Sequence, residues 1–395
     1  MALLQPLLYI GLALLILAFM IAVHELGHYV AGKILGFKIN EFAIGLGKPI
    51  FKRVSKKTGE VFSIRWIPFG GFCAFAGDDA AAGEGGARKE AEEREKQGLP
   101  TPKGVDFNKA APWKRLIVLF AGGFFNFLSA IVFAIIIIMI VGYYQAVSFN
   151  SLVKAFDGSD SPNAALFQHA EYGNVTHIHG VGRTADTIKS FTLTKTIGSH
   201  LGQFNETDRF YLRVEYENGM IETVGGFQRF KLQDGSTGIG ITGMRQVPLR
   251  GNFFEAIGYG VWYSLEIAWM ILVILGMLVT GQLNIFGSVG GPTATVSIMA
   301  EVVSWGYVSM LMLIPLISIN LALFNLLPIP ALDGARMVFV GIEWVRGKPV
   351  NPELEGKIHM IGFLVLFSFM IIVDIAFWVV GDGLGIFLLL SKFLL

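Results

Sequence analysis

The chain has 395 residues, of which 53% are hydrophobic and only 15% are charged, and its formal net charge is +1. This composition excludes an ordinary soluble globular protein and is typical of a polytopic membrane protein. The balanced charge argues against nucleic-acid binding. Because Cys73 is the only cysteine, an internal disulfide and a metal site with two or more thiolates are also excluded.

The first predicted membrane helix, residues 1–34, contains the sequence His24-Glu25-Leu26-Gly27-His28, and no charged residue precedes it. Two histidines four residues apart lie on one face of a helix, so both imidazoles can bind one Zn²⁺, and Glu25 can deprotonate a water there. A charged group costs about 2.5–3.5 kcal/mol in the membrane interior on insertion scales, so these residues indicate a function. The helix lacks the basic start of a cleavable signal peptide.

Residues 35–112 carry many lysines and arginines, and the positive-inside rule therefore places this segment in the cytosol. No Lys or Arg precedes Lys33, so the N-terminus is expected outside the cytosol. Residues 78–106 are rich in Ala, Gly, Glu and Lys and are predicted to form a solvated linker or a loose helix.

A second apolar stretch, residues 113–145, is predicted to cross the membrane back to the outside. Asn126 within it is expected to form an interhelical hydrogen bond. Residues 148–250 are polar and show strand-like alternation near 209–216, which ends in a turn. This segment is long enough for one small domain, which would lie outside the cytosol.

The third predicted membrane helix, residues 302–334, carries the sequence from Asn325 to Gly334 that reads NLLPIPALDG. A zinc ion held by two histidines needs a third ligand from the protein. Asp333 is the best candidate, because an unpaired carboxylate at membrane depth is unfavourable. Pro328 and Pro330 interrupt the helix, which is tolerated where protein or a water-lined cavity satisfies the freed backbone groups.

The position of His24 along its helix predicts the depth of this site. About 20 residues at about 1.5 Å each bring His24 close to the cytosolic side, so Asp333 must reach the same depth from outside. With the polar domain outside, the apolar stretch 257–280 within residues 251–301 cannot make a net crossing. We therefore expect an interfacial or re-entrant helix there. Residues 335–356 are then a cytosolic loop, and residues 357–395 form a fourth membrane helix and a C-terminal tail.

These motifs, with a domain outside the cytosol between them, resemble the site-2 proteases, a family of intramembrane zinc metalloproteases. The chain is most similar to the bacterial RseP/RasP-like branch, over nearly its whole length. Residues 41–49, 67–72 and 111–115 also resemble segments of that branch. One departure is Gly122-Gly123, where the family often has Gly-Pro.

The resemblance implies one Zn²⁺ per chain, with His24, His28 and Asp333 as ligands and Glu25 as the catalytic base. It also implies a membrane-reentrant β-hairpin near residues 61–76, whose edge pairs with an unwound substrate helix, and a PDZ-like domain at 148–250 that contacts peptide or substrate. The implied substrate-binding residues are Gly70, Gly71 and Phe72 in the hairpin and Asn325 on the third helix. Alternatively, the two glycines serve only as the turn of the hairpin and Asn325 only as a helix cap.

The predicted fold is therefore a polytopic α-helical membrane protein with about four spanning helices, a membrane-reentrant β-hairpin and one small β-rich PDZ-like domain outside the cytosol. The predicted function is zinc-dependent cleavage of membrane segments, as in anti-sigma factors or remnant signal peptides, in the bacterial cytoplasmic (inner) membrane. The predicted partners are a transmembrane protein substrate and the lipid bilayer, without nucleic acid. Two alternatives are a membrane zinc transporter or channel that uses the same residues, and a non-catalytic scaffold with a degenerate site.

Overall fold

The computed structural model describes residues 4–78, 96, 98, 100, 102–192, 196–242, 244–249, 252–283, 291–304 and 307–380. Most of the predicted linker at 78–106 and the end of the predicted C-terminal tail lie outside the described residues. The chain divides into two compact units. The first comprises Met1–Ala134 and Ser264–Ile386, and the second comprises Ile135–Tyr263 and Phe387–Leu395.

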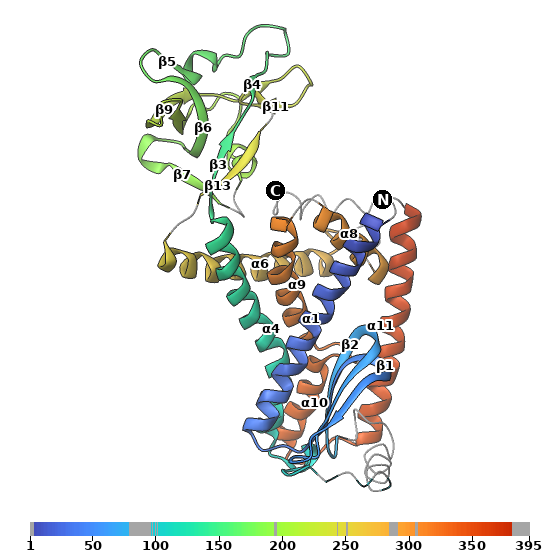
Figure 1. The fold of residues 1–395 in the computed structure, drawn as a ribbon. Coiled ribbons are helices and arrows are strands. Elements are labelled where there is room, and N and C mark those ends of the chain that lie inside the picture. The colour runs from blue at the N-terminus through green and yellow to red at the C-terminus, as the bar shows by residue number, and fades with distance from the viewer. Residues whose placement is uncertain are drawn as a thin grey trace. The chain divides into compact units, whose positions relative to one another are not determined.

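Long apolar helices dominate the first unit (Figure 1). Within the described residues, five helices are long and apolar enough to cross a membrane, namely α1, α4, α6, α9 and α11. This confirms the predicted polytopic α-helical membrane protein. The helices with their bounds are α1 (Leu4–Ile34), α4 (Pro112–Val141), α6 (Phe253–Val279), α8 (Pro292–Ser304), α9 (Tyr307–Asn325), α10 (Asp333–Arg346) and α11 (Pro352–Val380).

Small residues let α1, α4 and α9 approach closely. A Cβ at Gly27 of α1 would lie 2.8 Å from the carbonyl carbon of Ala121 in α4, closer than real Cβ atoms come. Such close crossings allow backbone-to-backbone packing where lipid offers no hydrophobic drive. Farther along α4, the hydroxyls of Ser129 and Ser318 lie 2.7 Å apart, and both donate to the carbonyl oxygen of Asn126. These contacts join α4 to α9 beside the predicted site.

The third predicted membrane helix, 302–334, is wrong in its bounds. Residues up to Ser304 belong to α8, and α9 runs only from Tyr307 to Asn325. A loop with Pro328 and Pro330 follows, because proline removes a backbone donor and cannot continue the helix.

The predicted cytosolic loop at 335–356 also differs, because most of it is helical as α10. Asp333 in the first turn and Arg346 in the last turn suit the helix dipole, and Gly347, with φ +67°, caps the end. These local signals for a helix start and a helix stop are present in the sequence.

An acidic side chain joins α11 to the start of α8. The carboxylate of Asp374 accepts hydrogen bonds from the backbone N–H of Thr293 at 3.2 Å, from its hydroxyl at 2.7 Å, and from the N–H of Ala294 at 3.0 Å. These groups begin a helix and have no partner within it. Asp374 therefore caps α8 from another element.

A sheet of two long strands, β1 (Ile39–Val54) and β2 (Val61–Phe75), packs against α1 (Figure 1). Both strands fold back on themselves. Residues 41–44 lie between 71–74 on one side and 61–64 on the other, and 51–54 also pair with 61–64. The predicted hairpin near 61–76 is therefore wrong in its pairing, since those residues form β2 and pair with β1.

Glu60 anchors this sheet to α1. Its buried carboxylate accepts hydrogen bonds from Lys33 Nζ at 2.6 Å, Thr58 Oγ1 at 3.0 Å and the Tyr29 hydroxyl at 3.2 Å. Tyr29 and Lys33 lie one turn apart on α1. Because Tyr29 directly follows His28, the anchor positions the sheet beside the predicted catalytic helix.

The second unit contains a β-rich domain with its own apolar core. In the described residues, seven strands form its main sheet, in the order β13-β3-β7-β6-β8-β9 with β5 paired to β6. Fully buried Phe191, Phe210 and Phe227 lie in the core. The elements are β3 (Tyr144–Ser148), β4 (Ser151–Leu152), β5 (Gln168–His169), β6 (Gly173–Gly182), β7 (Lys189–Thr192), α5 (Ile197–Leu201), β8 (Phe210–Tyr216), β9 (Ile221–Phe227), β10 (Phe230–Lys231), β11 (Thr237–Gly238), β12 (Ile241–Thr242) and β13 (Arg245–Leu249).

Helix α6 spans the boundary between the units. Its residues 264–279, which belong to the first unit, run crosswise to α1 and α11 rather than alongside them (Figure 1). Large apolar side chains are exposed on this helix, among them Trp262, Leu265, Trp269, Leu272 and Val273.

Candidate metal centre

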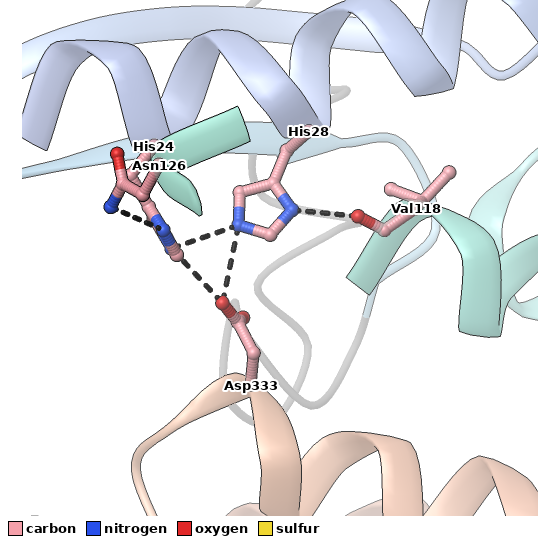
Figure 2. A network of polar contacts seen from close by, with 5 residues as sticks. All are labelled: His24, His28, Val118, Asn126 and Asp333. Carbon is pink, nitrogen blue, oxygen red and sulfur yellow. Dashed lines mark hydrogen bonds and ion pairs between the residues drawn. The ribbon is translucent and has the colours of Figure 1, made fainter. Parts of the chain in front are cut away.

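The side chains of His24 and His28 meet that of Asp333, which follows His24 by 309 residues, at one point of the first unit (Figure 2). His24 Nε2 lies 3.0 Å from Asp333 Oδ2, His28 Nε2 lies 3.2 Å from the same oxygen, and the two Nε2 atoms are 3.2 Å apart. Helix α1 supplies both imidazoles one turn apart, and Asp333 is the first residue of α10. Both histidines are buried and Asp333 is half-buried.

The hydrogen bond at the far side of His28 determines which ring nitrogen is free. His28 Nδ1 donates to the carbonyl oxygen of Val118 in α4 at 2.8 Å, so in the neutral ring Nε2 carries a lone pair. This lone pair faces the carboxylate of Asp333 and the ring nitrogen of His24. Three acceptor groups directed at one point repel each other unless a cation lies between them.

The spacing of these atoms suits a zinc ion. Zinc binds nitrogen and oxygen ligands at about 2.0–2.2 Å in a tetrahedron, so neighbouring ligand atoms lie about 3.3 Å apart. The observed separations of 3.0 and 3.2 Å fit this arrangement. As ligands, these three side chains would leave a fourth position open, as in catalytic zinc sites.

Asn126 of α4 lies behind His24. Its side-chain amide is fully buried, with Nδ2 3.5 Å from His24 Nδ1, while its Oδ1 has no hydrogen-bond partner among the described residues. The two ends of an amide are assigned from such contacts. Turning the amide lets Oδ1 accept a hydrogen bond from His24 Nδ1–H, which satisfies the oxygen and leaves Nε2 free to bind metal. The predicted interhelical contact of Asn126 is thus present, between α4 and α1.

Glu25 interacts electrostatically with His28, His24 and Asp333 and also contacts the sheet. Its side chain is buried, and the backbone N–H of Cys73 in β2 donates a hydrogen bond to its carboxylate. A Cβ at Gly71 would lie 2.9 Å from Glu25 Cγ, so this stretch of β2 passes directly over the side chain. This edge of β2 therefore faces Glu25.

Gly122 is a site residue whose importance the sequence did not reveal. A Cβ there would lie 2.6 Å from Cε1 of His28 and 2.7 Å from Cε1 of His24, so only glycine leaves room for both rings. In the sequence, Gly122-Gly123 stands out only as a departure from the Gly-Pro that the family often has.

Of the predicted substrate-binding residues, only some lie beside Glu25. Gly71 lies against Glu25, whereas Gly70, with φ +117°, faces Leu46. Arg65 lies over the Phe72 ring, 4.9 Å from its centroid. Asn325 is the last residue of α9, and its side chain has no hydrogen-bond partner in the part of the chain that the structure describes.

Residues 12–369 of the chain match the model of peptidase family M50. This chain belongs to peptidase family M50. Among the relatives of the M50 peptidase are zinc metalloproteases RasP of Oceanobacillus iheyensis, 29% identical over 91% of this chain and 96% of the relative, and of Bacillus licheniformis, 27% identical over the same shares. A putative zinc metalloprotease of Clostridium perfringens is 26% identical over 93% of this chain and 97% of the relative.

These matches confirm the resemblance to the site-2 proteases and the predicted class of enzyme, a metalloendopeptidase of that family. They do not favour the transporter alternative. The M50 peptidase is a multi-pass membrane protein with bacterial relatives, as predicted.

Proposed function

We propose that this M50 peptidase hydrolyses peptide bonds inside the membrane-spanning segments of single-pass membrane proteins, with one Zn²⁺ bound by His24, His28 and Asp333. Its relatives are named zinc metalloproteases, which supports this ion. The observation that carries the proposal is the meeting of three ligand atoms beside Glu25 and the edge of β2.

The residues of the chain divide the chemical work. When bound, the zinc supplies Lewis acidity that activates a water and polarises the scissile carbonyl. Glu25 accepts the proton of the attacking water and passes it to the leaving amine. Val118 and Asn126 hold the two imidazoles with Nε2 towards the ion, and buried packing around the site limits the access of other waters.

The edge of β2 at Gly71–Cys73 binds the substrate as an extended strand. A peptide bond within a helix is shielded, so the substrate must become extended before attack. Pairing as a strand along this edge satisfies the freed backbone groups and brings the scissile bond to Glu25. Phe72 and Gly70 shape the same edge, and the Asn325 amide binds the substrate backbone from the end of α9.

We place the N-terminus and the β-rich domain outside the cytosol of a bacterial cytoplasmic membrane, with the zinc site near the cytosolic side. The basic residues at 35–112 and the crosswise direction of α6 in the first unit support this topology. In it, α6 lies along the membrane surface or re-enters, although its length and composition would let it cross. A topology reporter fused after Gly281 tests the proposal, and a cytosolic signal there would contradict it.

The β-rich domain is, in this proposal, PDZ-like and contacts peptide or substrate. What supports this proposal is the antiparallel sheet with its own apolar core, in which buried Asn163 donates hydrogen bonds to the carbonyl oxygens of Gln228 and Ile239. The domain would admit only substrates already trimmed outside the membrane. If a chain lacking residues 150–250 still rejects full-length substrates, the filter proposal is wrong.

The variant Glu25→Gln tests the catalytic proposal. It should abolish cleavage of a membrane-embedded reporter substrate while the purified protein still binds one equivalent of zinc. Glu353→Gln, an exposed glutamate at the start of α11, is the matched control and should cleave normally. Retained cleavage by Glu25→Gln would end the proposed role of Glu25 as the base, absence of cleavage by the wild type would favour the non-catalytic scaffold, and zinc flux in proteoliposomes would favour the transporter.

A further inference from the structure

The loop that delivers Asp333 contains an unusual backbone conformation. Among the described residues other than glycine, Ala331 alone has a positive φ, +84°. This left-handed region is rarely adopted by residues with a Cβ, and it persists where the surroundings hold it. Ala331 lies two residues before Asp333, so the direction of the carboxylate depends on this conformation.

Helix α11 holds the loop at this residue. His359 Nδ1 accepts a hydrogen bond of 3.0 Å from the backbone N–H of Ala331. One turn later, Gly362 faces Pro330 so closely that a Cβ at 362 would meet the proline ring. His359 and Gly362 therefore form one docking face for the loop.

The loop has few other restraints. Pro328 and Pro330 have no backbone N–H. The remaining amides at 329 and 332 bond only within the loop, to Leu327 at 2.7 Å and Ile329 at 3.1 Å. Leu332, the residue before α10, has no side-chain cap bond. In the described structure, His359 is thus the side chain from another element that binds the loop backbone between Pro328 and Asp333.

The state of the His359 ring follows from this bond. Since Nδ1 accepts, the proton lies on Nε2, which is buried and 4.0 Å from a carboxylate oxygen of Glu355. Phe339 of α10 packs against the ring, with centroids 5.6 Å apart. Residue 359 therefore needs a flat side chain with a hydrogen-bond acceptor at the position of Nδ1. The Oδ1 atom of an asparagine can supply that acceptor.

We propose that His359 is a positioning residue, which holds Ala331 in its left-handed conformation and so directs Asp333 at the metal. The inference rests on the proposed function in one respect, that Asp333 is a zinc ligand. His359 touches neither metal nor substrate and acts through the loop. Helix α11 thereby contributes to the metal centre, although it is far in sequence from α1, which carries His24, Glu25 and His28.

Zinc affinity of the full-length protein in detergent, measured by competition with a chromogenic chelator, tests the inference. His359→Phe keeps the ring packing but loses the acceptor, and zinc affinity should fall about 10–100-fold, as for other residues that orient ligands. His359→Asn should restore affinity to within a few-fold of wild type. Phe363→Leu, on an exposed face of the same helix, is the control and should bind zinc normally. If His359→Phe does not fold, His359→Leu takes its place.

A second substitution separates positioning from general packing. Glycine adopts positive φ readily, so Ala331→Gly should bind zinc almost normally and should reduce the loss caused by His359→Phe. Equal losses in both backgrounds would overturn the inference, as would wild-type affinity in His359→Phe or no rescue by asparagine. Asp333→Ala distinguishes a failure of the proposed ligand set from a failure of the positioning role of His359. If it keeps zinc, the proposed ligand set is wrong, whereas if it loses zinc and His359→Phe does not, only the positioning role is wrong.

Discussion

Gly122 of α4 lies so close to His28 of α1 that a methyl group at position 122 would be 2.6 Å from Cε1 of the imidazole. The same methyl group would press on His24. The two helices can cross at the metal centre only because this residue has no side chain. The position of one histidine ring is therefore set by a residue 94 positions away in the sequence.

Gly122→Ala should lower zinc affinity and cleavage at least 10-fold, because the rings or the helix backbones must move away from the metal position. Chelator competition and cleavage of a reporter substrate measure the two effects. Gly341→Ala in α10, where a Cβ meets open space, is the matched control and should bind zinc and cleave normally, with a gain in stability of up to about 1 kcal/mol from helix propensity. Normal zinc affinity in Gly122→Ala would show that the helices do not cross so closely.

Asn126→Leu should weaken zinc binding and also lower the stability of the metal-free protein. Loss of the contact with His24 Nδ1 should weaken zinc binding about 10–100-fold. The free energy of unfolding should fall by about 1–3 kcal/mol, because leucine keeps the volume but leaves the buried His24 N–H without an acceptor. Thermal unfolding of the metal-free protein measures stability. Ser129→Ala, which removes a hydroxyl bound to the Asn126 carbonyl, is the control and should leave zinc affinity normal.

Asn325→Ala should raise KM for a membrane substrate up to about 10-fold, the loss expected for one hydrogen bond. Zinc affinity should stay at the wild-type value, because Asn325 only ends α9 and does not reach the metal in our proposal. Asn320→Ala, an exposed asparagine in the same helix, is the matched control. An unchanged KM for Asn325→Ala would leave Asn325 with a helix-capping role only.

Asp106 should make stability depend on pH at the acidic end. Hydrogen bonds from Lys109, at 2.8 Å, and Lys38, at 2.9 Å, hold the pKa of Asp106 below its ordinary value of 3.8. Because the folded-state pKa is the lower one, this stabilisation is fully present above about pH 4 and is lost as pH falls through the folded-state pKa. The thermal midpoint should fall less steeply below pH 4 in Asp106→Asn than in the wild type, and equal slopes would contradict the assignment.

Local patterns in the sequence predicted the parts that are local in the structure. The apolar runs that became α1, α4 and α11 were located within a few residues, because membrane thickness demands a minimum length of apolar helix. His24 and His28 were paired by the spacing of a single helix turn. Asp333 was found because a carboxylate beside a proline-broken apolar helix is costly without a partner.

Non-local relationships could not be predicted in this way. Residues 41–44 lie between two parts of β2, and strand alternation alone does not specify which segments pair. The third membrane helix was drawn too long, because hydropathy does not show that α8 ends at Ser304 and α9 begins at Tyr307. The cap of α8 by Asp374 joins residues 80 positions apart and has no local signal.

The sequence by itself therefore determined the chemistry of this M50 peptidase, since the HExxH helix and the aspartate after the broken helix name the candidate ligands and the base. Only the tertiary structure decided which residues hold those groups in place. Val118, Gly122 and Asn126 meet α1 where two helices cross, and His359 meets the loop from α11. Such contacts depend on how separate helices pack, and close packing is a property of the folded chain rather than of any local pattern.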